Sequence, residues 1–189
     1  DLVLDNFCGK GTNIIAAAYE GRKVVGYDLS QLNLQLIKTA CLEHTAIKKD
    51  DLMLHHSCGV EMVEYSQMSN IFDLVLNDIP YIFRAEDYGN DDPRDLCNIK
   101  DLDSFNDKVE RCLINMKRLI KPSNWEEKIF HPIVMKVGSA RRSETGLVDM
   151  ATEIEIISRR VGLVLHDKII NELNSAFQSY NLGRCIENR

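Results

Sequence analysis

The sequence predicts an α/β fold, a doubly wound and mostly parallel Rossmann-like sheet with helices on both faces. Short apolar runs of strand-forming residues alternate with segments of helical period along all 189 residues. Two of these runs end on an aspartate and a glycine- or proline-bearing turn, at Asp5 and Asp78. Ligands of open α/β sheets bind beyond the carboxyl ends of strands, so these two aspartates indicate where the site lies.

Length and composition indicate one globular domain over residues 1–189, with 44% hydrophobic and 28% charged residues. No apolar run reaches the roughly 18 residues of a membrane span, and no signal peptide opens the chain, which predicts a cytoplasmic protein without membrane partners. The six cysteines form no C-x-x-C pair, which indicates reduced thiols and no zinc site. Because the net charge is −6, we expect any affinity for nucleic acid to come from a local patch or from parts outside this sequence.

The first half of the chain is expected to form two strand–helix units, at residues 2–5 with 13–20 and at 23–28 with 30–43. Gly21 ends the first helix and Ser30 caps the second. The buried face of the second helix is expected to carry Leu32, Leu36 and Ile37.

A third strand at 52–56 and a short helix at 59–68 lead to the run 72–76, which is nearly all apolar. Such a run is typical of a strand buried on both faces. It is expected to stop at Asn77-Asp78, because Pro80 then prevents continued pairing.

In the second half, the long polar loop 83–103 favours a functional lid, and Ser104 to Asp107 is a capping-box signature. The helix behind it is expected to end before Pro122 and to bury Val109, Leu113, Met116 and Ile120. The expected order then continues with a fifth strand at 132–138 and a polar loop at 139–145. It ends with a helix that buries Ile154, Ile157 and Val161 and a sixth strand at 163–170. The chain starts inside a strand pattern and stops without a final element, so it is expected to be cropped at both ends, with the last strand missing.

The order strand, glycine turn, helix, strand, acid indicates a mononucleotide-binding half, with Asp28 placed to hold a ribose hydroxyl pair. Gly9-Lys10-Gly11 lacks the third glycine of a dinucleotide motif. Asp5 would repel a pyrophosphate, but it suits the ammonium group of an amino acid. S-adenosyl-L-methionine (SAM) carries that ammonium and no phosphate, so the residues favour SAM over NAD. The alternative is that Asp28 merely ends a strand and the glycines merely form a turn.

Asp5-Asn6-Phe7-Cys8-Gly9-Lys10-Gly11-Thr12 resembles the D-P-F-x-G-x-G-T motif of SAM-dependent DNA amino-methyltransferases, and Asp78-Ile79-Pro80-Tyr81 resembles their D-P-P-Y motif. Further likeness is found at Asp91, Pro93-Arg94-Asp95-Leu96, Asn98-Ile99, Lys121-Pro122 and Asp167-Lys168-Ile169-Ile170. The resemblance implies a Rossmann-like methyltransferase sheet, SAM as cofactor and DNA as partner. It implies cofactor contacts from Asp5, Phe7, Gly9, Gly11, Thr12, Asp28, Leu29 and Cys58.

Three positions depart from the pattern of the family. Asn6 and Ile79 each replace a proline, and Cys58 stands where the family places an acid that contacts the adenine amino group. Pro80 still holds residue 79 extended, and Ile79 keeps its backbone carbonyl.

The chemistry expected at Asp78 is methylation of an exocyclic amino group, which is a poor nucleophile because its lone pair is delocalised into the base. The Asp78 carboxylate and the Ile79 carbonyl would accept its two N–H groups and free that lone pair. Tyr81 would stack on a flipped-out base, and Phe83 and Tyr88 would form further walls.

The sequence favours methylation of adenine N6 in DNA, with cytosine N4 next. RNA bases and a protein glutamine amide remain open, as does a non-catalytic SAM-fold subunit, which Ile79 and Cys58 favour.

His55 and His56 are adjacent on a strand and point to opposite faces, so they cannot ligate one metal ion together. Arg141 and Arg142 are expected in a solvated turn, and the oligomeric state stays open.

Overall fold

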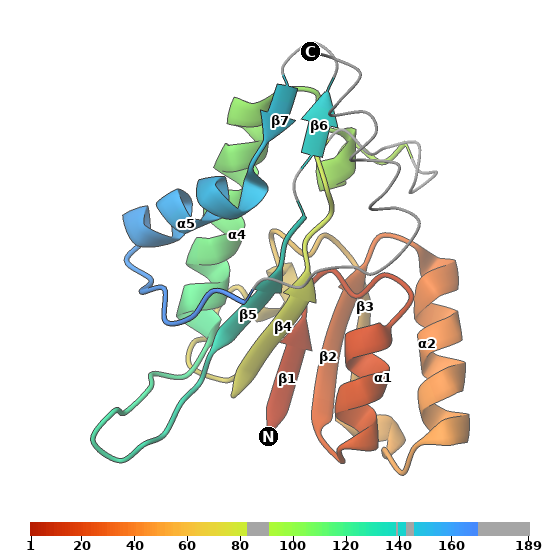
Figure 1. The fold of residues 1–189 in the computed structure, drawn as a ribbon. Coiled ribbons are helices and arrows are strands. Elements are labelled where there is room, and N and C mark those ends of the chain that lie inside the picture. Colours follow the sequence, from red (N-terminus) through yellow and green to blue (C-terminus); the bar gives the residue numbers. More distant parts are fainter. Residues whose placement is uncertain (83–90, 139, 143–145, 170–189) are drawn as a thin grey trace.

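The computed structural model describes residues 1–82, 91–138, 140–142 and 146–169. Its centre is a parallel sheet of five strands in the order β3-β2-β1-β4-β5, shown in Figure 1. The strands are β1 (Leu2–Asp5), β2 (Lys23–Asp28), β3 (Leu52–His56), β4 (Leu74–Asp78) and β5 (Ile133–Lys136). The chain order reverses between β1 and β4, and this reversal is where open α/β sheets hold their ligands.

Two helical layers cover the sheet, which confirms the predicted α/β fold. Helices α1 (Thr12–Tyr19) and α2 (Gln31–His44) cover one face, whereas α4 (Leu102–Leu119) and α5 (Met150–Arg160) cover the other (Figure 1). Neighbouring strand residues alternate between the two cores: Val3 packs with α1 and α2, and Leu4 packs with α4 and α5. Short elements complete the described residues: 3₁₀ helices at Lys49–Asp51, Val63–Tyr65 and Leu96–Asn98, and the antiparallel pair β6 (Ala140–Arg142) and β7 (Gly146–Val148).

The fourth strand lies two residues later than the apolar run predicted. β4 includes Asn77 and Asp78, which pair with Met135 and Lys136 of β5, while Phe72 forms an isolated bridge with Ile120. The prediction located the strand by its apolar residues. The pairing continues into polar residues because β5 runs alongside as far as Lys136.

Two helix predictions were wrong in detail. Ile37 is buried as predicted, but Leu32 and Leu36 are exposed at 63% and 56%. The buried face of α2 is the i, i+3, i+7 set Leu34, Ile37 and Cys41. Helix α4 begins before the predicted capping box, since Asp101 is its N-cap and accepts from Ser104 N at 2.8 Å. The predicted caps and faces elsewhere are confirmed: Ser30 caps α2, and α4 and the residue after it bury Val109, Leu113, Met116 and Ile120.

Three more predicted elements differ from the structure. The predicted helix at 59–68 is only a 3₁₀ turn, and residues 163–169 of the predicted sixth strand are not in a strand. Part of the predicted loop 139–145 pairs with Gly146–Val148 as β6. In α5, Ile154 and Ile157 are buried as predicted, while Val161 beyond its end is half-buried.

None of the helices in the described ranges is long and apolar enough to cross a membrane.

Candidate functional site

Three aspartates end three adjacent strands at one edge of the sheet. Asp5 ends β1, Asp28 ends β2 and Asp78 ends β4, and the strands are parallel in the order β2-β1-β4. Their carboxylates lie close enough for the charges of Asp78 and Asp28 to act on Asp5. The structure thus brings together the aspartates of both sequence motifs.

Asp5 is the buried member of this group, with 1% of its surface exposed. Its Oδ1 accepts from Phe7 N at 3.1 Å, and its Oδ2 accepts from Asn13 Nδ2 at 2.9 Å. Burial raises the pKa of the carboxyl to about 7, since the two hydrogen bonds only partly oppose the desolvation and the charges of Asp78 and Asp28 add to it. A cation placed beside Asp5 would therefore be strongly stabilised.

The glycine turn after β1 fits closely against the neighbouring elements. Gly11 has φ +89°, and a Cβ there would lie 2.4 Å from Ile37 Cγ1, so no other residue is accommodated at this position. Cys8 N donates to Tyr27 O at 2.9 Å, which fixes the turn to β2. Gly9 N donates to Asp28 Oδ2 at 2.8 Å, so the backbone amide that would face a ligand is held by the acid of the next strand.

Asp28 organises the ends of β1 and β2. Besides Gly9 N, its carboxylate accepts from Ser30 N at 2.7 Å and from Asn33 Nδ2 at 3.2 Å. Burial raises its pKa, and these hydrogen bonds oppose the rise. A carboxylate has about four lone-pair sites, so three internal bonds leave room for a further donor such as a hydroxyl group.

A buried amide pair, which the sequence did not reveal, joins β1 to β4. Asn77 Nδ2 donates to Asn6 Oδ1 at 2.8 Å, and each residue is 1% exposed. Asn6 Nδ2 donates to Gly59 O at 2.9 Å, and a Cβ at Gly59 would lie 1.6 Å from Asn6 O. The asparagine that replaces the proline of the motif therefore links β1, β4 and the loop after β3. A polar residue inside an otherwise apolar strand, Asn77, was the available signal for this contact.

A second missed residue, Asn13, ties the start of α1 to β1 and β4. Its Nδ2 lies 2.9 Å from Asp5 Oδ2 and 3.4 Å from Leu76 O of β4. The start of α1 is therefore anchored on both motif-bearing strands.

The turn after β4 is held by Lys136 of β5 and by Tyr81 within the turn. Lys136 Nζ lies 2.6 Å from Asp78 Oδ2, and Tyr81 Oη donates to Asp78 Oδ1 at 3.3 Å. The Ile79 side chain is 2% exposed in the core, which anchors the turn where the resembling motif has a proline. Pro80 and Tyr81 are half-buried, so the ring of Tyr81 is partly accessible.

The remaining predicted site residues are distributed around this edge. Thr12 is exposed at the start of α1, and Leu29 O contacts His56 Nε2 at 2.9 Å. Phe7 and Cys58 are half-buried and pack against the core beneath α4. Phe83 and Tyr88 lie outside the described residues, so their predicted role stays a prediction.

The segment 91–98 borders the cofactor half, although the sequence indicated only a polar loop there. The charge of Asp95 acts on Asp28, and that of His56 acts on Asp92. Arg94 forms a two-pronged ion pair with Asp92, with Nη2–Oδ2 2.7 Å and Nε–Oδ1 3.0 Å. Asp95 also caps the short helix Leu96–Asn98 by accepting from Cys97 N.

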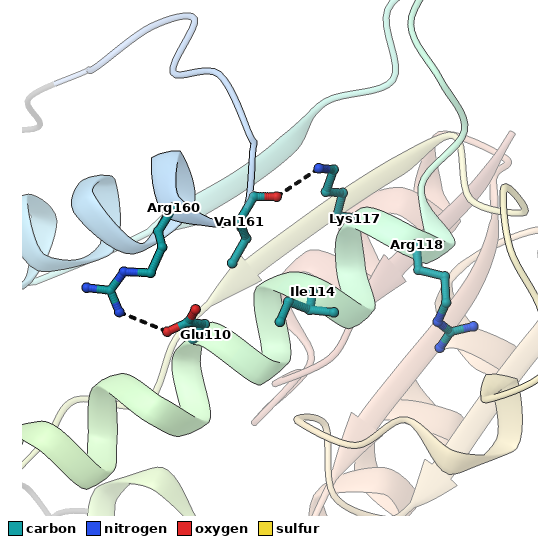
Figure 2. A pocket seen from close by; sticks show the side chains of 6 residues that line it. All are labelled: Glu110, Ile114, Lys117, Arg118, Arg160 and Val161. Carbon is teal, nitrogen blue, oxygen red and sulfur yellow. Dashed lines mark hydrogen bonds and ion pairs between the residues drawn. The ribbon is translucent and has the colours of Figure 1, made fainter.

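A hollow of about 520 Å³ lies between α4 and α5, away from the aspartates. Figure 2 shows the ion pair Arg160–Glu110 and the hydrogen bond from Lys117 to Val161 O beside it. The hollow lies near the end of β4 that is opposite Asp78. Arg118, one of its lining residues, accepts through its backbone O from Asn70 N, and Asn70 is eight residues before Asp78. The carboxylate that lines the hollow, Glu110, is ion-paired with Arg160 at 3.0 Å. The described residues contain no group of three His, Cys, Asp or Glu suited to a metal ion.

No family model matches the chain, and no curated protein matches it significantly. Solved structures do match. A TehB-like SAM-dependent methyltransferase from Corynebacterium glutamicum has a TM-score of 0.51 at 16% identity, over 88% of this chain and 67% of that one. A putative rRNA-methylase from Clostridium thermocellum has a TM-score of 0.53 at 16% identity, over 92% of this chain and 83% of that one.

The cyclase SpnF also matches, with a TM-score of 0.53 at 15% identity, over 85% of this chain and about half (51%) of that one. The chain therefore has the Rossmann-like fold found in these methyltransferases. Because one structure of the same fold is a cyclase, the fold leaves the reaction to be argued from the site.

Proposed function

We propose that the protein is a SAM-dependent methyltransferase acting on an exocyclic amino group of a nucleic-acid base, with adenine N6 in DNA favoured and cytosine N4 next. The observation that carries the proposal is the meeting of Asp5 and Asp78 at the tips of the adjacent strands β1 and β4. Asp5 is followed by the glycine turn, where we propose that the cofactor binds. Asp78 begins the turn that resembles the D-P-P-Y motif, where we propose that the methyl acceptor binds.

The cofactor half fits the charge of SAM. Asp5 is buried with a pKa of about 7 and has two further carboxylates nearby, so this edge favours a cationic ligand. SAM, when bound, supplies a methyl group activated by a positive sulfonium and carries an ammonium group. Asp5 would hold the ammonium, and Asp28 would accept a ribose hydroxyl through its remaining lone pair. Both assignments leave the internal hydrogen bonds of the turn intact.

Asp78 is suited to accept from an amine. Its two described hydrogen bonds, from Lys136 and Tyr81, occupy one site on each oxygen and leave further lone pairs. With 41% of its side chain exposed, Asp78 can reach a substrate without unfolding the turn. An N–H accepted by this carboxylate makes the nitrogen a better nucleophile and stabilises the positive charge that develops on it. Tyr81, next to it, would stack on the base.

A base in RNA is the second candidate substrate, because one of the solved structures of this fold is described as a putative rRNA-methylase. A non-catalytic SAM-binding subunit is the third candidate, since Ile79 and Cys58 depart from the motif of active enzymes. A protein glutamine amide stays an alternative acceptor.

The test is methyl transfer from tritiated SAM to unmethylated DNA, RNA and protein in parallel, followed by nucleoside analysis. We expect label in N6-methyladenine of DNA. Label confined to RNA or to protein would identify that class of molecule as the substrate instead of DNA. Calorimetry with SAM accompanies the assay. Binding without transfer to any substrate would support the non-catalytic subunit, and absence of both would refute the proposed function.

A further inference from the structure

Lys136, at the end of strand β5, makes two hydrogen bonds with the turn at residues 78–81, and Gly138, two residues beyond β5, lies against the Tyr81 ring. Ile79 N donates to Lys136 O at 3.3 Å, and Lys136 Nζ donates to Asp78 Oδ2 at 2.6 Å. A Cβ at Gly138 would lie 3.0 Å from the ring of Tyr81. Figure 1 shows β4 and β5 side by side, and Lys136 is the register partner of Asp78.

We propose that Lys136 and Gly138 are positioning residues, which set the orientation of the Asp78 carboxylate and the place of the Tyr81 ring. This inference rests on the proposed function, because it takes Asp78 and Tyr81 as the groups that meet the base.

Lys136 acts on the local order of the turn at residues 78–81 rather than on the global stability of the fold. The ion pair with Asp78 is open to solvent, with side-chain exposures of 69% and 41%, and such pairs contribute little to folding. A charge-assisted bond to Oδ2 does, however, restrict rotation of the carboxylate. The donors on the two oxygens come from different sides, Lys136 on Oδ2 and Tyr81 on Oδ1. The carboxylate is therefore fixed before the substrate arrives.

Lys136 also offsets the repulsion at this edge. The charges of Asp5 and Asp78 act on each other, and the ammonium of Lys136 is the closest cation to Asp78 among the described ion pairs. Without it, the flexible Asp78 side chain would turn away from Asp5 and from the position that the amine must reach. A misplacement of a reacting group by about 1 Å can lower the rate about 100-fold.

Gly138 leaves the space that the Tyr81 ring occupies. A Cβ there would lie 3.0 Å from Cζ, 3.2 Å from Cε1 and 3.3 Å from Oη of the ring. These atoms form the far end of a flexible side chain, so an added methyl group would move the ring and leave the fold intact. The stacking surface would move with it.

The test compares Lys136→Met with Lys136→Arg and with Lys121→Met as the matched control. Lys121 forms the same kind of pair with Asp73, at 2.7 Å, but near the opposite end of β4. We expect Lys136→Met to lower kcat about 10- to 100-fold without changing the Kd for SAM, and Lys136→Arg to recover most of the rate. Lys121→Met should leave kcat within about twofold. Equal kcat in Lys136→Met and Lys121→Met would overturn the role of Lys136.

Gly138→Ala tests the other contact. We expect a rise of about 5- to 10-fold in KM for the nucleic acid, because base stacking on an aromatic ring is sensitive to its position, with the Kd for SAM unchanged. The same KM as wild type would overturn the role of Gly138.

Amide hydrogen exchange of the full-length chain separates this inference from the proposed function. Exchange across residues 78–82 should speed up about tenfold in Lys136→Met and stay at the wild-type rate in Lys121→Met. Inactive wild-type protein with this exchange pattern would refute the methyltransferase but keep the positioning role. Unchanged exchange in Lys136→Met would overturn the positioning role whatever the activity.

Discussion

The turn after β1 and the turn after β4 lie at the same edge of the sheet, yet they are held in different ways. The first is held mainly by partners nearby in the chain: Asp5 accepts from a residue two positions on, and Gly9 N donates to Asp28, 19 positions on. The Asp78 carboxylate of the second has a near partner, Tyr81, and a distant one, Lys136, which is 58 positions away. The bond between Asn6 and Asn77, 71 positions apart, joins the first turn to β4.

The two turns differ in exposure as well. Asp5 is 1% exposed and its pKa is raised to about 7, so its charge depends on pH and on what binds beside it. The Asp78 side chain is 41% exposed and ion-paired. Under the proposed function, the first turn would bind a cation and the second would present an oriented acceptor to a substrate.

The largest effect is expected from Asp78→Ala. It removes the acceptor that the reaction needs while leaving the first turn untouched, so kcat should fall by about 100- to 1,000-fold with the Kd for SAM within about twofold. Steady-state transfer and calorimetry measure the two quantities. Asp73→Asn, which alters the ion pair near the other end of β4, is the control and should retain transfer. Parallel loss of cofactor binding and transfer in Asp78→Ala would make Asp78 a structural residue and remove the distinction between the turns.

The reciprocal change is Asp28→Ala, which acts on the first turn alone. Loss of a charged acceptor costs about 1.5–3 kcal/mol, so the Kd for SAM should rise about 10- to 100-fold. The kcat at saturating SAM should change less than threefold, because the turn at Asp78 has other partners. An unchanged Kd by calorimetry would remove Asp28 from the site.

Much of the fold could be predicted from the sequence, because local patterns determine it. Strands β1, β2 and β3 were predicted at their observed bounds, since each is an apolar run ended by a turn signal. The end of β4 was missed because strand pairing with β5, rather than hydropathy, carries it through Asn77 and Asp78. The predicted sixth strand was wrong for the opposite reason: residues 163–169 have the strand pattern but form no described pairing.

The candidate site could be predicted only where its residues carry chemistry of their own. The motifs located Asp5, Asp28 and Asp78 at one edge, as the structure has them. They could not reveal Asn77 or Lys136, whose importance comes from partners 71 and 58 positions away. Asn6 was treated as a departure from a motif, whereas the structure makes it the centre of a buried hydrogen-bond network.

A test of that network is Asn77→Leu, which keeps the number and branching of the side-chain heavy atoms and leaves Asn6 Oδ1 buried without its described donor. An unsatisfied buried polar group costs about 1–3 kcal/mol, so urea denaturation should show a loss of this size in unfolding free energy. Asn6→Ala and the double variant complete a thermodynamic cycle, in which the two losses should be far from additive. Additive losses would mean that the contact between the two amides contributes nothing and that β1 and β4 are joined by packing alone.

The smallest effect expected is a dependence of cofactor affinity on pH, which distinguishes the buried acid from the exposed one. Asp5 in the free protein has a pKa of about 7, raised mainly by burial, and a bound ammonium would favour its charged form. Between pH 5.5 and 7 the charged fraction of such a group rises about 16-fold, while an α-amino group with a pKa near 7.7 stays largely protonated, so the Kd for SAM should fall about 10- to 15-fold.

The stability of the free protein should follow the opposite trend, which separates the two effects of the same carboxyl. Because the folded pKa of Asp5 lies above its unfolded value of 3.8, its contribution to stability is present below that value and is lost as pH rises to about 7. Asp5→Asn keeps the shape of the side chain but cannot titrate. Both the calorimetric Kd for SAM and the unfolding free energy should therefore lose the part of their pH dependence that comes from Asp5. Asp73→Asn, which alters an acid at the other edge, should leave the slope of the Kd in place. A wild-type Kd that is constant over this range would mean that no cation binds at Asp5, and the first turn would then have to be read as a structural turn.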